Sequence, residues 1–343
     1  MRLPRHAEIW LPGYSVTRLR AWFRREQPKR VWFTIADHFE PFWRNEKEGL
    51  ARERVAIWRK RWPEIARRHA DSTGCPPQYV FFYPEEEYRP CLLESLAELV
   101  REGYGDVEIH LHHDQDSEAA FVDRLQRFIE TLHARHGLLR RVDGRLVFGF
   151  IHGDWCLDNS RPDGRGCGLN NEITLLRELG CYADFTMPSG ASPTQARQVN
   201  EIYWATDDPL RPKSYDTGRR VIPGHWDTGD LLMIPGPLGL RWGQNRWVPR
   251  MEAGELAHHD TANPYRVRRW LELAPRLGGD IFLKLHTHGT QEPNSAALLV
   301  GGELHRTFLL LAAECARRDL ELHFVTAWQM RQAVERAASV SLG

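Results

Sequence analysis

The sequence predicts an α/β fold built on a parallel β-sheet. Short apolar, β-branched runs alternate with longer segments whose apolar residues recur at helical spacing. Clusters of His, Asp and Glu directly follow several of these runs, as active-site groups follow the carboxyl ends of strands in α/β proteins. The length of 343 residues suits one large domain of this class or two smaller ones. These observations predict parallel βα units whose strand ends share one functional edge.

The overall composition argues against several classes of partner. Hydrophobic residues make up 42% of the chain, charged residues 27%, and the formal net charge is zero. This balance favours neither nucleic acid nor a membrane surface as a partner. The longest apolar stretch, 307–313, is too short for a membrane span, and no apolar signal segment follows Met1. We therefore expect a cytoplasmic protein.

The six cysteines are scattered through the chain without a CxxC pair. Their spacing predicts neither a disulfide scaffold nor a thiolate zinc site. They are Cys75, Cys91, Cys156, Cys167, Cys181 and Cys315.

The first part of the chain contains a basic extension at 1–29, with a short helix expected at 16–25, and then three βα repeats. The strands are predicted at 31–36, 79–83 and 107–112, with helices at 51–70 and 91–102 between them. A single domain is expected to span 30–335, with a long loop-rich insertion at about 188–263. The remaining elements are helices at 118–135, 170–179, 265–277, 303–318 and 328–338, and strands at 146–151, 182–185, 280–285 and 321–325.

The segment 188–263 breaks this alternation. It is rich in Pro, Gly and Trp, and only short strands at 201–205 and 231–234 are expected in it. Loops of this length in a compact domain are usually functional or an insertion. Its interleaved aromatic and charged residues fit a sugar-binding wall as well as they fit an irregular lid packed on itself.

The third predicted strand carries the densest group of metal-ligand residue types. Side chains alternate along a strand, so Glu108, His110 and His112 are expected to share one face. Three imidazoles and two carboxylates between His110 and Asp116 are typical of a divalent metal site. A solvated strand end with incidental histidines is the simpler alternative. His113 is expected to face away, mostly into solvent.

The order of motifs resembles the polysaccharide deacetylase family, the NodB-homology carbohydrate esterases. Asp37 follows the first strand, His112 and Asp116 have the i, i+4 spacing of the family's histidine motif, and Leu283 to His286 fits its Leu-x-Leu-His signature. The loop 152–155 and the strand 180–184 occupy the family's two intermediate motifs. The resemblance implies a deformed parallel (β/α)7-type barrel over roughly 30–330.

Two positions depart from the family pattern. The family's first aspartate, its general base, is Ala36 here, and the second motif histidine is Asp116. The resemblance implies a divalent ion, zinc first, with cobalt, nickel or manganese as alternatives. It implies these residues in three roles: metal ligands Asp37, His110, His112 and Asp116; catalytic groups His286 as acid, with Asp154, His38 or Glu40 as base; and substrate-binding groups His152, Trp155, Asp184 and His288.

Several of these residues have a plain structural alternative. Asp37 suits a turn cap, His110 a hydrogen-bonded core histidine, and Asp116 the N-cap of the helix that follows. A metal-bound water with a lowered pKa would attack an amide or ester. The leading hypothesis is therefore a hydrolase that deacetylates an N-acetylated sugar or glycan precursor. Phosphoester hydrolysis is an alternative, and Ala36 favours a third, an inactive barrel that binds a glycan or another partner.

Overall fold

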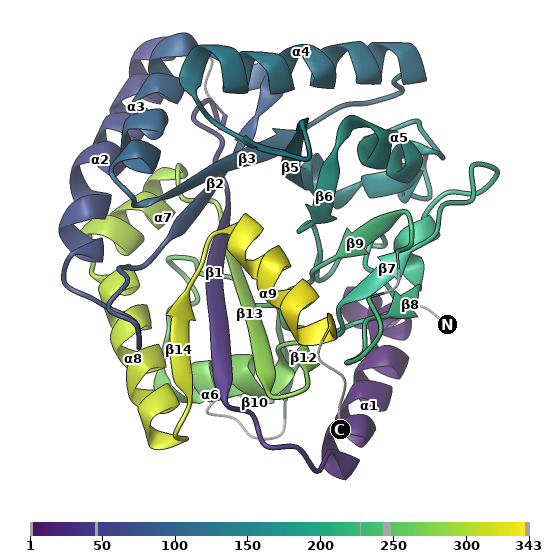
Figure 1. Ribbon diagram of the computed structural model, residues 1–343, viewed down its shortest axis with the longest axis vertical. Coiled ribbons are helices and arrows are strands. Elements are labelled where there is room, and N and C mark those ends of the chain that lie inside the picture. The colour runs from purple at the N-terminus through teal and green to yellow at the C-terminus, as the bar shows by residue number, and fades with distance from the viewer. Residues whose placement is uncertain (1–2, 45–46, 227, 243–247, 340–343) are drawn as a thin grey trace.

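Strand β1 (Arg30–His38) lies in the middle of a mixed α/β structure whose central sheet is mostly parallel (Figure 1). The computed structural model describes residues 3–44, 47–226, 228–242 and 248–339. β13 (Asp280–Thr287) pairs with one edge of β1 along its length. On the other edge, β14 (Glu321–Phe324) pairs with the first half of β1 and β2 (Tyr79–Pro84) with the second half. All three pairings are parallel, so the strand ends meet at one edge.

The parallel series continues from β2 to the far side of the sheet. Each neighbour in this series is parallel to the one before it. The strands are β3 (Gly105–Leu111), β5 (Arg145–His152), β6 (Cys181–Asp184) and β9 (Leu231–Met233). The remaining strands are antiparallel additions: β4 (Arg140–Val142), β7 (Tyr203–Ala205), β8 (Arg219–Arg220), β12 (Arg276–Leu277) and the separate ribbon β10 (Gly239–Trp242) with β11 (Pro249–Glu252).

Most helices cover one face of this sheet. Side chains alternate between the two faces of each strand, and the apolar side chains on the covered face contact these helices. Val107, Ile109 and Leu111 of β3 lie in the large core under these helices. α9 (Ala327–Ser339) packs on the opposite face, in a second core with Ala36, and crosses β1 and β13 in Figure 1. The other helices are α2 (Glu48–Ala66), α3 (Pro90–Arg101), α4 (Glu118–His136), α5 (Glu172–Leu179), α6 (Pro264–Leu273), α7 (Glu292–Ser295) and α8 (Glu303–Arg317).

Helix α6 ends earlier than its apolar pattern predicts. The expected helix over 265–277 stops at Leu273, and Arg276 and Leu277 form β12 against β13. Ala274 is extended, with φ −55° and ψ 143°, and Pro275 follows it. Proline disfavours helical geometry in the residue before it, which accounts for the early end.

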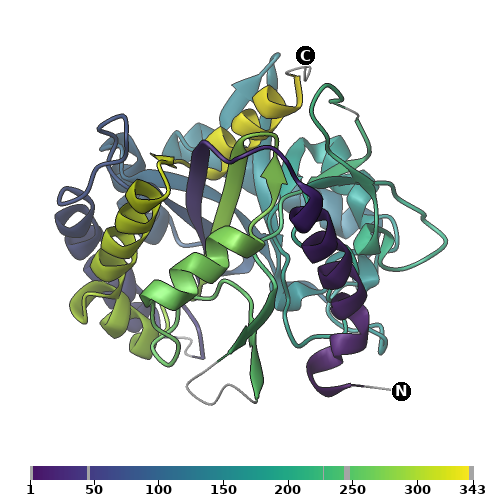
Figure 2. The ribbon, with the colours of Figure 1, turned by 90° about the horizontal axis from the view of Figure 1, so that it is seen from below.

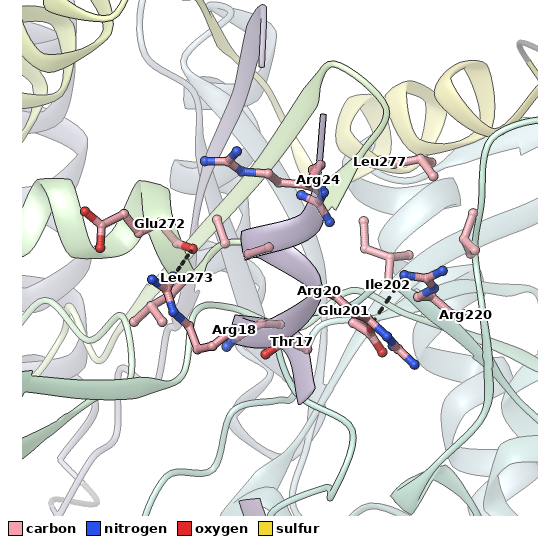
Figure 3. Close-up of a pocket in the computed structure, with 15 residues that line it drawn as sticks. Thr17, Arg18, Arg20, Arg24, Glu201, Ile202, Arg220, Glu272, Leu273 and Leu277 are labelled. Carbon is pink, nitrogen blue, oxygen red and sulfur yellow. Dashed lines mark hydrogen bonds and ion pairs between the residues drawn. The ribbon is translucent and has the colours of Figure 1, made fainter. Parts of the chain in front are cut away.

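The N-terminal extension forms a longer helix than predicted, α1 (Ala7–Phe23). Trp10 is buried with Val199 and Leu238, so α1 packs on the irregular segment that was expected as loops. α1 lies beside α6 (Figure 2), and the Arg18 side chain donates to the carbonyl of Glu272. Arg20 forms an ion pair with Glu201 across a small arginine-rich hollow of about 40 Å³ (Figure 3).

No single helix in the described part of the chain has both the length and the apolar character to cross a membrane, although the bent pair Glu292–Val300 and Glu303–Arg317 meets the criteria when taken together.

Candidate metal centre

Histidines from three strands meet where β1, β3 and β13 end. The ring centroid of His38 lies 5.0 Å from that of His110, 4.7 Å from that of His288 and 6.3 Å from that of His286. Glu40, two residues beyond β1, brings a carboxylate to this group. His38, Glu40 and His110 each offer a ligand atom, and these atoms lie within 4.8 Å of one another. We call these three residues the strand-end cluster.

The hydrogen bonds of His110 leave one ring nitrogen available to the cluster. Its Nδ1 lies 2.8 Å from the carbonyl oxygen of Ile151, on the neighbouring strand β5. A carbonyl only accepts, so Nδ1 carries the proton. Nε2 faces Glu40 Oε1 at 3.3 Å. Histidine ligands of metals commonly donate their second ring N–H to a carbonyl in this way, which fixes the tautomer and the ring orientation.

The electrostatics of the other two members suit a cation. Burial raises the pKa of Glu40, but the hydrogen bond and charge of His110 and the charges of His288 and His112 lower it below its usual value overall. Burial, together with the charges of His288 and His110, holds the pKa of His38 well below its usual value. Glu40 is therefore anionic and His38 neutral, the forms in which both residue types bind metals.

His112 has a different environment from the one predicted for a ligand. Its Nδ1 donates to Glu86 Oε1 at 2.5 Å, and a third of the side chain is exposed. Burial lowers the pKa of His112, but the hydrogen bond and charge of Glu86 and the charge of Glu40 raise it to about 9. In this arrangement His112 is an imidazolium at the rim, with Nε2 at 3.6 Å from Glu40 Oε1.

Asp37, the ligand implied by the family resemblance, points to the opposite face of β1. Its carboxylate accepts from the Gly289 N–H at 2.7 Å and from the Tyr79 hydroxyl at 2.8 Å. Burial raises the pKa of Asp37 to about 8. Side chains alternate along β1, and Ala36 and His38 lie on the face that carries the strand-end cluster. Asp37, between them, therefore points to the other face, toward the helices. The side chain fastens the turn after β13 to β1 and lies outside the strand-end cluster.

Two other predicted site residues belong to a second group, buried under the helices. His152 Nε2 lies 2.8 Å from His113 Nε2 and 3.4 Å from Glu172 Oε1. Asp116 accepts from Arg124 at 2.7 Å and lies 3.5 Å from His113 Nδ1. The N-cap of α4 is Ser117, whose hydroxyl accepts from the Ala120 N–H.

The prediction that His113 faces solvent is wrong, because its side chain is fully buried. β3 ends at Leu111, so strand alternation no longer sets the direction of the residues beyond it. The ring of His113 instead packs on Phe121 of α4, with a centroid distance of 5.1 Å.

Trp155 forms one wall of the strand-end cluster. Its ring centroid lies 5.6 Å from His38 and 5.9 Å from His288. Asp154 and Trp155 have φ of 52° and 57°, a left-handed backbone that is strained for residues with a Cβ and is concentrated at functional sites. A Cβ on Gly153 would lie 2.2 Å from the His112 ring, so glycine is needed for this approach.

A surface hollow of about 770 Å³ begins at Asp154 and Trp155 and extends toward the N-terminal helix. Its other polar lining residues include Arg161, Ser189 and Glu8. The hollow is large enough for a sugar-sized molecule. The segment after β6, part of the irregular region 188–263, therefore lines a space beside the strand-end cluster.

The other predicted site residues near these strand ends are His286, His288 and Asp184. Burial and the charges of Lys284 and His288 hold the pKa of His286 well below its usual value, and no described residue bonds its buried Nδ1. Burial also lowers the pKa of His288. Asp184 accepts from the hydroxyl and the N–H of Thr186. Burial raises its pKa to about 7.

Glu86, Cys167 and Glu172 were not among the predicted site residues. Glu86 sits in the run of three acidic residues that directly follows β2, a position that could have marked it. Cys167 and Glu172 come from a glycine-rich loop and a helix start, and no spacing pattern links them to His113 or His152.

Comparison of the sequence with known protein families and with curated proteins found no match.

Proposed function

We propose that this chain is a metal-dependent hydrolase whose divalent ion is held by His38, Glu40 and His110. The observation that carries the proposal is the donation from His110 Nδ1 to Ile151, which leaves Nε2 beside Glu40 in a group whose ligand atoms lie within 4.8 Å of one another. Three protein ligands leave coordination positions open, as in catalytic zinc sites. Zinc is the first choice for a His, His and Glu ligand set, and cobalt, nickel and manganese are alternatives.

Bound there, the ion would polarise a substrate carbonyl and lower the pKa of a coordinated water. Ala36 occupies the position of the family's general base and has no carboxylate. Glu40 and Asp154 supply carboxylates near the site, and Asp154 is exposed at its rim. Asp154 is the proposed base for the water proton. The leaving amine would take up the proton that Asp154 removes from the water, and neutral His286, beside His38, is the proposed relay for it.

The proposed substrate is an N-acetylated sugar or glycan precursor, and the reaction is hydrolysis of its amide. Trp155 offers an aromatic face at the entrance, next to the 770 Å³ hollow. The proposal places this chemistry in the cytoplasm, where the six cysteines, all free thiols, would stay reduced.

We further propose that the sheet closes into a deformed (β/α)7-type barrel, as in the polysaccharide deacetylases that the motif order resembles. Support comes from Lys284 on β13. Its Nζ donates to the carbonyls of Phe185 and Met187, just beyond β6 on the other side of the parallel series. A lysine that reaches across in this way fits strands that curve toward each other around the site.

The test starts from protein purified without a metal-chelating tag. We expect at least one equivalent of divalent metal, and release of acetate from N-acetylhexosamine substrates rather than phosphate from an aryl phosphate. His110→Ala should remove the activity. His133→Ala is the matched control, because its Nδ1 also bonds a backbone carbonyl, that of Leu138, away from the site. Phosphate release without acetate release would refute deacetylation, and equal activity in both variants would refute the metal centre.

A further inference from the structure

Four buried side chains form a second group of metal-ligand types on the helix-covered side of the sheet. One follows the end of β3 and one is the last residue of β5. The other two lie in the loop before α5 and at the first position of α5. Each offers a ligand atom, and these atoms lie within 4.8 Å of one another. We call these residues the buried cluster: His113, His152, Cys167 and Glu172.

We propose that the buried cluster binds a second divalent ion, with zinc the expected metal, and that this ion fastens the 153–171 loop to the sheet. The site would be structural, because four protein ligands close the coordination sphere and all four residues are buried. The proposal is independent of the catalytic role given to the strand-end cluster, since the two clusters share no residue.

The separations between these side-chain atoms are close to, or shorter than, the edges of a tetrahedral zinc site. His113 Nε2 lies 2.8 Å from His152 Nε2 and 3.2 Å from Glu172 Oε1. Cys167 Sγ lies 3.4 Å from Glu172 Oε2. Zinc bonds of 2.0–2.3 Å at tetrahedral angles give edges of roughly 3.3–3.6 Å. One bound ion would require the two imidazole nitrogens to move apart by roughly 0.5 Å and a single Glu172 oxygen to act as ligand.

A hydrogen bond orients the His152 imidazole for this role, and a carboxylate lies behind the His113 imidazole. His152 Nδ1 lies 2.6 Å from the Gly153 carbonyl, so it carries the proton and Nε2 presents its lone pair. His113 Nδ1 faces the Asp116 carboxylate at 3.5 Å, and Arg124 holds that carboxylate in place. A carbonyl or a carboxylate behind each ligating histidine is the usual support of a zinc site.

Without an ion, the buried cluster has fewer N–H donors than its close contacts between acceptor atoms require. His113 Nε2–H would have to serve both His152 Nε2 and Glu172 Oε1, at 2.8 and 3.2 Å. On binding, the Cys167 thiol would release its proton to solvent, and the ion would form bonds to one thiolate, one carboxylate and two neutral imidazoles. The two negative ligands balance the charge of the ion, so the buried group is neutral overall.

The ion would stabilise a loop that has little regular structure of its own. Asp154, Trp155, Asp158 and Asn159 all have positive φ. The loop is tied down near the buried cluster, where the Asp116 N–H donates to the carbonyl of Cys167 and the Asp158 N–H to Glu172. Since Trp155 lies in this loop, the ion would also hold the wall of the strand-end cluster in place.

Cobalt(II) is the probe that separates the two clusters, because only a cysteine ligand gives thiolate-to-cobalt charge transfer. Metal-free protein reloaded with cobalt is expected to bind two equivalents and to show this near-ultraviolet band. Cys167→Ser should lose the band and one equivalent of metal. Cys156→Ser, a buried cysteine of the same loop whose thiol donates to Asp154, should keep both. His110→Ala should keep the band and lose the other equivalent.

The wild-type measurement decides the proposal even when a variant fails to fold. A cobalt-loaded wild-type protein without the charge-transfer band, or a band that persists in Cys167→Ser, would overturn it. In either case the buried cluster is a hydrogen-bonded network, and activity of the strand-end cluster is unaffected by that result.

Discussion

The strand-end cluster and the buried cluster take residues from the same short stretch, yet they differ in access. His110 and His113 are three positions apart, and both side chains are fully buried within the fold. His110 lies inside β3 and faces a cluster whose rim residues, His112 and Glu86, are about one third exposed. His113 lies beyond the strand and turns under α4, among residues that are all buried. The point at which the strand ends therefore separates a cluster with a partly exposed rim from one whose members are all buried.

The two clusters also differ in how many ligands they offer. The strand-end cluster has three, which suits an ion that must bind water and substrate. The buried cluster has four, which suits an ion that only holds structure. The comparison predicts that damage to the first affects turnover and damage to the second affects stability.

Among the variants that test this comparison, Glu172→Ala should change the free energy of unfolding most. Glu172 is fully buried and accepts from the Asp158 N–H as well as facing His113. Its removal leaves buried polar groups unpaired and should lower the free energy of unfolding by about 3–5 kcal/mol. Urea unfolding followed by circular dichroism measures this change. Glu40→Ala is the counterpart, expected to change the unfolding free energy by less than about 1 kcal/mol, because active-site charges are seldom stabilising. Similar losses in both variants would contradict the division of roles.

Glu40→Ala should instead remove activity. Loss of a metal ligand should lower kcat/KM for deacetylation by on the order of 10³-fold, about 4 kcal/mol of transition-state stabilisation. Steady-state acetate release measures the change, with metal content determined on the same sample. Glu98→Ala is the matched control, since this glutamate forms an exposed ion pair with Arg59 far from the strand ends. Retained turnover in Glu40→Ala would show that this carboxylate is not a ligand.

Asp37 allows a third test, in which the family pattern and the geometry disagree. Asp37→Asn keeps an oxygen for the Gly289 N–H and a polar group for the Tyr79 hydroxyl. We expect unchanged metal content and a change in unfolding free energy below about 1 kcal/mol, whereas Asp37→Ala should cost about 1–3 kcal/mol by leaving both donors unpaired. Metal analysis and urea unfolding of the two variants check this. Loss of metal in the asparagine variant would restore Asp37 as a ligand.

The parts of the fold that follow from local pattern were predictable from the sequence. The alternation of β1, β2 and β3 with α2 and α3 is strong because buried strands and amphipathic helices impose distinct periods. β4 and β12 were missed because they have three and two residues, too few to show a period. Alternation along β1 places Asp37 and His38 on opposite faces, so the sequence pattern itself separates Asp37 from the residues that share a face with His38.

The candidate sites were predictable only where a strand leads into them. His38, Glu40 and His110 lie in or directly after β1 and β3, so their meeting follows from parallel pairing. Cys167 and Glu172 reach His113 only through the path of an irregular loop. The absence of a CxxC pair argued against a thiolate ligand, but ligands from four separate places leave no such spacing.

Trp155 provides the smallest and most specific test, because it joins the two clusters: its ring faces His38, and its backbone belongs to the loop that the buried cluster holds. Trp155→Ala removes an aromatic face worth about 0.5–1.5 kcal/mol to a stacked partner, so KM should rise by up to about tenfold while kcat changes little. Steady-state kinetics on an N-acetylhexosamine substrate separates the two constants. Trp22→Ala is the control, since Trp22 is 86% exposed on α1. A fall in kcat without a change in KM would place Trp155 in the chemistry instead of the binding wall, and the loop would then matter to the reaction itself.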